Sequence, residues 1–146
     1  MPHINVWLHF VWTTKDREPL LADTIRKSVL DHIRANAREK GIFIGALNGW
    51  LEHIHCLVSL GSDQTLEKIM QLIKGESSHW INKNALVATK FHWQDEYFVV
   101  SVSESLLPAV RKYIDNQEQH HSKRSFDEEF EDFLSRGGFK KFPDSK

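Results

Sequence analysis

Residues 50–60 read WLEHIHCLVSL, and the rest of the chain is organised around this stretch. Its apolar second half predicts a buried strand. Because side chains alternate between the two faces of a strand, His53 and His55 point the same way and Ile54 points the opposite way. Two imidazoles on one face can share a metal ion. Backbone or carboxylate partners could equally satisfy both rings, whose burial without any partner would cost roughly 1–3 kcal/mol each.

Hydrophobic periodicity and turn residues divide the chain into strands and helices. Strands are predicted at 3–13, 42–47, 53–60 and 96–103, with a hairpin turn at Asn48-Gly49 or slipped toward Glu52. Helices are predicted at 23–40, 65–84, 105–121 and 126–135. The order β-α-β-β-α-β predicts an α+β, ferredoxin-like antiparallel sheet with additional C-terminal helices. The second sheet face needs a cover, which the third helix or a partner subunit could supply.

The first predicted strand has an unusual polar face. His3, Asn5 and His9 alternate along it with Trp7. Such a face either borders a functional site or is simply solvated.

Composition limits the class of protein. With 146 residues and 40% hydrophobic content, the chain predicts a single globular domain. The lone cysteine, Cys56, predicts a buried free thiol in a reducing compartment. The sequence shows no signal-peptide pattern and no apolar run of about 18 residues, so we expect a cytoplasmic protein without a membrane partner.

Charge is unevenly distributed. The net charge is −1, and residues 127–132 carry five acidic side chains. We therefore expect a nearly neutral domain at 1–125 and an acidic C-terminal helix and tail at 126–146. Any basic surface for nucleic acid must be local.

Tyr113 and Gln117 are four residues apart, so they lie on one face of the third predicted helix. A tyrosine hydroxyl, with a reference pKa of about 10, becomes a useful nucleophile when a metal polarises its target. Attack on a phosphodiester would store the bond as a reversible phosphotyrosine. The amide oxygen of Gln117 would complete a metal site with His53 and His55. These ligand types do not decide between Mg²⁺, Mn²⁺ and Zn²⁺.

Taken together, these motifs resemble a known family. His53-Ile54-His55 resembles the histidine–hydrophobe–histidine (HUH) motif, and Tyr113 with Gln117 resembles the tyrosine motif of single-tyrosine HUH transposases. This is the IS200-like family of small insertion sequences, whose relatives include the REP-associated tyrosine transposases. Residues 11–17 (VWTTKDR) and the Leu72-Ile73-Lys74-Gly75 segment are also similar. Cys56 departs from the pattern, because the family usually carries another apolar residue there.

The resemblance implies a function. The protein would cut single-stranded DNA beside hairpin-forming ends and rejoin it, with Tyr113 forming a 5′-phosphotyrosine. His53, His55 and Gln117 would hold Mg²⁺ or Mn²⁺, and the protein would act as a homodimer, with Tyr113 serving its own or its partner's site. Basic side chains would contact the DNA; the candidates are Lys15, Arg17, Lys74, Lys83, Arg111 and Lys112.

Two other functions remain open from the sequence. The first is a domesticated nucleic-acid-binding module that keeps this fold without cleaving. The second is an unrelated metal hydrolase in which His120 or His121 adds a ligand and Tyr113 plays no part. The intact set of His53, His55, Tyr113 and Gln117 favours the transposase.

Overall fold

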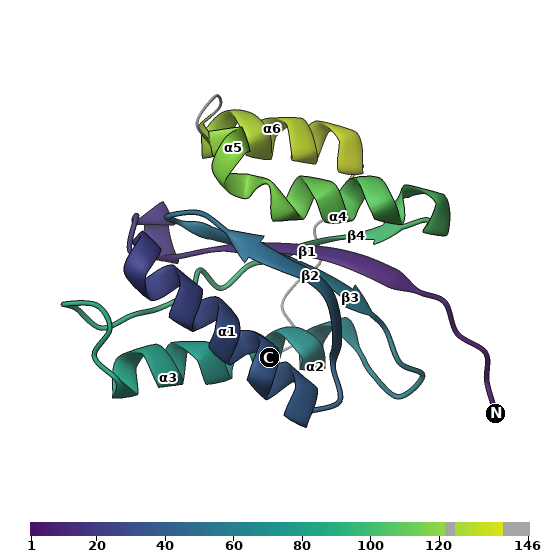
Figure 1. Cartoon of the computed structure of the whole chain (residues 1–146), viewed down its shortest axis with the longest axis horizontal. Helices are drawn as coiled ribbons and strands as arrows, with labels where there is room; N and C mark the ends of the chain where they lie inside the picture. Colours follow the sequence, from purple (N-terminus) through teal and green to yellow (C-terminus); the bar gives the residue numbers. More distant parts are fainter. Residues whose placement is uncertain (122–124, 139–146) are drawn as a thin grey trace.

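The computed structural model describes residues 1–121 and 125–138 and has three layers (Figure 1). A four-stranded antiparallel sheet lies in the middle, in the order β2-β3-β1-β4. Helices α1, α2 and α3 cover one face, and α4, α5 and α6 lie over the other. The predicted α+β, ferredoxin-like arrangement is confirmed.

The elements lie close to their predicted positions. The strands are β1 (Trp7–Thr13), β2 (Phe43–Gly49), β3 (His53–Ser59) and β4 (Phe98–Val102). The helices are α1 (Asp23–Glu39), α2 (Leu66–Met70), α3 (Glu76–Lys83), α4 (Leu107–Asp115), α5 (Gln117–His121) and α6 (Phe126–Gly137). A short 3₁₀ turn, η1 (Lys15–Arg17), follows β1, and one π-helical turn, η2 (Gln71–Gly75), joins α2 to α3.

The main core lies between the sheet and the first helical layer. Phe10 and Trp12 from β1 and Ile54 from β3 point into it and are fully buried. They meet apolar side chains of α1 and of the α2–α3 helix, such as Ile33 and Ile69. This packing gives the sheet its orientation, because the alternating side chains of β1 and β3 must then face the opposite layer.

The hairpin turn differs from the Asn48-Gly49 prediction. Both residues belong to β2, and the turn is made by residues 50–52, closed by Trp50 N–H donating to the His53 carbonyl at 3.0 Å. Gly49 is required by a close approach rather than by a turn, since a Cβ there would lie 2.4 Å from the His53 carbonyl oxygen. The alternative register, slipped toward Glu52, is therefore the one adopted.

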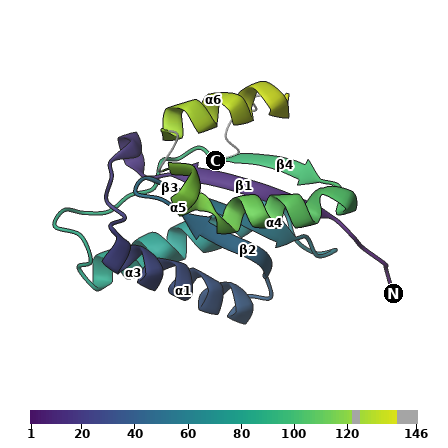
Figure 2. The same ribbon diagram turned by 45° about the horizontal axis from the view of Figure 1, so that its top comes forward.

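The predicted third helix is interrupted. α4 ends at Asp115 and α5 begins at Gln117, with Asn116 between them. This break lets Gln117 turn toward β3, where its side chain is completely buried. The view in Figure 2 shows α4 running along the sheet and α6 lying above it.

Candidate active site

β3 places the two histidines at the centre of the sheet. His53 pairs with Thr13 of β1, and His55 pairs with Val11. Their side chains point to the face covered by α4 and α6, with exposures of 0% and 2%. Because β3 is hydrogen-bonded on both sides, to β1 and to β2, the spacing of the two rings is fixed by the backbone.

Neighbouring side chains orient each ring. His53 Nδ1 lies 2.8 Å from the Glu52 carboxylate, and His55 Nδ1 lies 2.9 Å from His9 Nε2. An Nδ1–H that donates to a carboxylate leaves Nε2 available as a ligand, an arrangement common behind metal-bound histidines. Both Nε2 atoms turn toward the space beneath α6. The polar face predicted for the first strand therefore borders the site through His9.

Burial and the neighbouring His55 lower the pKa of His9 to about 3. The ring is therefore neutral at physiological pH, with one donor and one acceptor nitrogen. A neutral His9 can share its hydrogen bond with His55 Nδ1 without placing a second positive charge beside the site.

α4 and α5 bring Tyr113 and Gln117 to the histidines of the same chain. Gln117 Oε1 lies 3.0 Å from His53 Nε2, and its amide nitrogen donates to the Tyr113 carbonyl at 3.3 Å. The Tyr113 ring stands perpendicular to the His55 ring, with 5.5 Å between centroids. The four residues singled out in the sequence thus meet in one place without a second subunit.

Glu129 of α6 also belongs to this cluster, and sequence reasoning missed it. Its carboxylate accepts a hydrogen bond from the Tyr113 hydroxyl, and its Oε1 lies 3.1 Å from His55 Nε2. Its Oε2 lies 3.9 Å from His53 Nε2. A signal was present in the sequence: Glu129 falls on the apolar stripe of the acidic helix, between Phe126 and Phe133.

The environment of Glu129 is unfavourable for a carboxylate. Burial raises its pKa to about 7; His53 opposes the rise and Glu52 adds to it. Burial of a negative charge is costly, which is why burial raises this pKa. The carboxylate is therefore poised to gain from any positive charge that enters the cluster.

α6 packs over the histidine cluster and covers it. The Phe126 ring stacks on the His53 ring at 4.0 Å between centroids. Arg17 lies over the rings of Phe126 and Phe130, at 5.3 and 4.7 Å, and pairs with Asp127 at 2.5 Å. The acidic helix thus packs on the sheet, and both imidazoles are shielded from solvent.

Comparison with known proteins identifies the family. A family model described as "Transposase IS200 like" matches residues 3–117. The chain belongs to this transposase family. The match ends at Gln117, so α6 lies beyond it.

Individual relatives agree with this assignment. The chain is 24% identical over 115 residues to the ISDra2 transposase TnpA of Deinococcus radiodurans, covering 75% of this chain and 81% of that protein. A solved structure of a candidate transposase from Deinococcus radiodurans R1 superposes with a TM-score of 0.65 at 23% identity, covering 80% of this chain and 93% of the other. A REP-associated tyrosine transposase bound to a REP hairpin gives 0.63 at 19% identity, covering 100% and 91%. The two structural matches show a shared fold.

The residues of this IS200-like protein fit a divalent cation. Suitable atoms of His53, His55 and Glu129 all lie within 4.8 Å of one another. The separations of 3.0 Å between His53 Nε2 and Gln117 Oε1, and of 3.1 Å between His55 Nε2 and Glu129 Oε1, suit neighbouring ligands of one ion with bonds of about 2.1 Å. Mixed imidazole and oxygen donors suit Mn²⁺ and also accept Mg²⁺.

Some of the basic residues expected to contact DNA lie beside this cluster. Lys15 and Arg17 form η1 at the end of β1, and Arg17 already contacts α6. Arg111 and Lys112 are exposed on α4, where Arg111 lies over the Trp7 ring at 5.2 Å. Arg17 and helix α4, which carries Arg111 and Lys112, lie on the same side of the sheet as the histidines.

The other two lie elsewhere. Lys74 is in η2, and its Nζ donates to the Gln94, Asp95 and Glu96 carbonyls at 2.7, 3.0 and 3.4 Å. Lys83 ends α3 in the opposite helical layer. The side chains of His120 and His121 lie outside the described residues. Within the described parts of the chain, no helix is long and apolar enough to cross a membrane.

Proposed function

We propose that this transposase cuts and rejoins single-stranded DNA at hairpin-marked ends, through a 5′-phosphotyrosine on Tyr113. One observation carries the proposal. The Glu129 carboxylate accepts the hydrogen bond of the Tyr113 hydroxyl and also contacts His55 Nε2, so the phenol lies one carboxylate away from the imidazole pair. Nucleophile and metal ligands are therefore close enough to act on one phosphate.

Each residue has a chemical role in this proposal. His53, His55 and Gln117 would hold Mg²⁺ or Mn²⁺, and Glu129 would add a further oxygen ligand in the DNA-free protein. When bound, the ion supplies Lewis-acid polarisation of the phosphate oxygens. The Tyr113 oxygen forms a bond to phosphorus, the bond to the 3′ oxygen breaks, and a 3′-hydroxyl is released. Attack by a later 3′-hydroxyl reverses these changes and frees Tyr113.

α6 must move aside for DNA to enter. The two imidazoles are at most 2% exposed, and the Glu129 carboxylate fills the space between them and Tyr113. Phosphate and carboxylate oxygens are similar hard anionic ligands. A phosphate of the bound strand would therefore take the place of Glu129, and Lys15, Arg17, Arg111 and Lys112 would contact the neighbouring phosphates.

A covalent-adduct assay tests the proposal. The protein is incubated with Mn²⁺ and a single-stranded DNA that carries a hairpin, then run on a denaturing gel. We expect a protein–DNA adduct that Tyr113→Phe abolishes, while Tyr97→Phe, the matched change at the other tyrosine, keeps it. An adduct that persists in Tyr113→Phe would remove Tyr113 as the nucleophile.

A domesticated binding module is the second candidate, and the burial of His53 and His55 under α6 favours it. Tight hairpin binding without any adduct, also in a chain shortened before Phe126, would support this candidate. Hydrolysis without an adduct would instead indicate a metal hydrolase. The homodimer implied by the family is tested by sedimentation; because the cluster is built from one chain, we expect adduct formation not to depend on dimerisation.

A further inference from the structure

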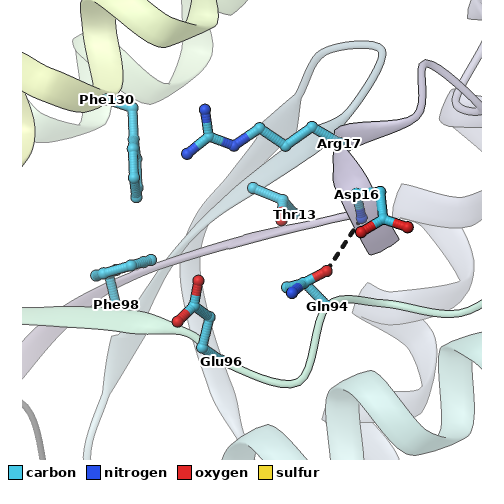
Figure 3. A pocket seen from close by; sticks show the side chains of 7 residues that line it. All are labelled: Thr13, Asp16, Arg17, Gln94, Glu96, Phe98 and Phe130. Atoms are coloured by element: carbon cyan, nitrogen blue, oxygen red, sulfur yellow. Dashed lines mark hydrogen bonds between the residues drawn. The ribbon is translucent and has the colours of Figure 1, made fainter.

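A hollow of about 320 Å³ lies beside the histidine cluster (Figure 3). It is bounded by the end of β1, by η1, by residues 94–96, by the start of β4 and by α6. Thr13 on its floor is the β1 partner of His53, so the hollow adjoins the proposed metal site on the same sheet face. This volume is at the small end for ligand sites and suits one planar ring rather than a duplex.

Its walls combine aromatic and hydrogen-bonding groups. Phe98 and Phe130 meet edge to face, with 4.8 Å between centroids, so the Phe98 ring already accommodates a second aromatic ring. Figure 3 shows the Glu96 carboxylate next to Phe98, and the amide nitrogen of Gln94 on the side toward Glu96. The hollow thus offers a stacking surface, a hydrogen-bond donor and a strong acceptor together.

The polar wall is held rigidly. The side-chain Oε1 of Gln94 accepts from the Asp16 backbone N–H at 3.0 Å, and the backbone N–H of Gln94 donates to the Thr13 carbonyl at 2.9 Å. Lys74 Nζ donates hydrogen bonds to the backbone carbonyls of residues 94–96. Asp16 and Arg17 both adopt positive φ, 56° and 54°, which is costly for residues other than glycine. Fixed groups of this kind lose little entropy when a ligand binds.

We propose that this hollow receives one unstacked base of the single strand next to the bond that is cut, and that it prefers guanine. The proposal rests on the proposed function, because it assumes a single-stranded substrate at the neighbouring histidines. Single-stranded bases are read by stacking on aromatic side chains and by hydrogen bonds to their Watson–Crick edges. When α6 moves aside with Phe130, the base takes the place of the Phe130 ring against Phe98, and Gln94 and Glu96 read its edge.

Guanine matches this edge best. Its N1–H and its exocyclic amine are two adjacent donors for the Glu96 carboxylate, and its O6 accepts from the Gln94 amide. Cytosine and adenine each offer one exocyclic amine for Glu96, and thymine offers no amine. A carboxylate that accepts two N–H donors makes the stronger, charge-assisted contact.

Fluorescence anisotropy with labelled oligonucleotides tests the preference. The probes are an oligomer of fifteen thymidines and three versions with a central guanine, adenine or cytosine, measured with Mn²⁺. We expect the guanine version to bind about tenfold tighter than the all-thymidine strand, as for one well-formed bidentate base contact. Phe98→Leu, which keeps an apolar side chain but loses the flat ring, should weaken all four probes about fivefold or more.

Two variants remove the edge contacts with little change of shape. Gln94→Glu keeps the acceptor for the Asp16 amide and loses the donor, and Glu96→Gln loses the charge. Both should reduce the guanine preference to less than about threefold. Asp95→Asn, an equal change of charge at the neighbouring exposed residue, should keep it.

The outcomes separate this inference from the proposed function. No guanine preference in the unmodified protein, no binding of any probe, or a preference that survives both Gln94→Glu and Glu96→Gln overturns the base site. If the preference follows these variants but no substrate ever forms an adduct, the base site stands and the cleavage function fails. If adducts form without any base preference, cleavage stands and the base site fails.

Discussion

Replacing Glu129 with glutamine should stabilise the metal-free protein at alkaline pH. The substitution keeps the shape of the side chain and an oxygen that can accept from the Tyr113 hydroxyl, but removes the buried negative charge. The raised pKa of Glu129, about 7 against an ordinary 4.5, means that the folded state binds more protons than the unfolded state between these two values. Stability contributed by the protonated carboxyl is therefore lost as pH rises from about 4.5 to 7.

The magnitude follows from the same shift. A rise from 4.5 to about 7 corresponds to about 3 kcal/mol, which we reduce to about 2 kcal/mol because relaxation of the surrounding groups lowers the cost of a buried charge. For a chain of 146 residues this is roughly 6–8 °C in Tm. The lowered pKa of the buried His9 makes the folded state less stable in acid. This effect is the same in the unmodified protein and in Glu129→Gln, so it cancels in the difference between their stabilities.

Manganese should cancel most of the advantage of the variant. A ligand that binds only the folded state stabilises it by RT ln(1 + [L]/Kd), about 2.7 kcal/mol at a hundredfold excess over Kd. Loss of the carboxylate should weaken Mn²⁺ binding about 10- to 100-fold, the range known even for groups behind metal ligands. The gap in Tm at pH 8 should therefore close when Mn²⁺ is added.

Thermal unfolding at pH 4.5, 6, 7 and 8, with and without Mn²⁺, measures both effects. Glu131→Gln, an exposed position on the same helix, is the control and should follow the unmodified protein. The reasoning is refuted if Glu129→Gln gains nothing at pH 8 over pH 4.5. Equal stabilisation by Mn²⁺ in both proteins would remove Glu129 from the ligand set.

Three further outcomes follow from the structure. Cys56 should not react with a thiol reagent until the protein is unfolded, because burial raises its pKa to about 12, and fast labelling of the native protein would contradict its placement. Gly49→Ala should cost about 2 kcal/mol or more of unfolding free energy in denaturant titrations, because its Cβ would lie 2.4 Å from the His53 carbonyl oxygen. The control, Gly75→Ala, has nothing within 4 Å of its Cβ and should be neutral or stabilising by up to about 1 kcal/mol. Equal effects of the two substitutions would argue against this register of the hairpin. Hydrogen exchange of α6 amides should slow when Mn²⁺ is added and accelerate when hairpin DNA is added with it, whereas unchanged exchange would show that α6 does not move.

The sheet and the histidine pair could be predicted because their signals are local. Alternation with a period of two places His53 and His55 on one face, and the spacing of four places Tyr113 beside Gln117. The position of the turn could not be fixed in the same way. Asn48-Gly49 is a strong turn signal, but here glycine is needed at position 49 because the His53 backbone leaves no room for a side chain.

α6 shows what local patterns leave out. Its acidic composition predicts a helix and tail that follow the domain, and nothing in the composition shows that its apolar stripe packs on the sheet with Glu129 facing the histidines. An acidic residue between Phe126 and Phe130 on such a stripe was the available signal. Its partners, His53, His55 and Tyr113, lie on other elements, and only the tertiary fold shows that they share one space.

The free energy that packs α6 on the sheet is large enough to order the helix and small enough for a ligand to displace it. Burying Phe126 and Phe130 contributes roughly 3–6 kcal/mol, and the Arg17–Asp127 pair, being largely exposed, adds at most about 1 kcal/mol. Fixing the helix and burying the Glu129 carboxylate offset much of this. DNA at a hundredfold excess over its Kd supplies about 2.7 kcal/mol, which is of the same order as the remainder. Under the proposed function, metal and DNA would therefore act on α6 in opposite directions: a bound cation would strengthen the contact of Glu129, and a DNA phosphate in the place of Glu129 would release the helix.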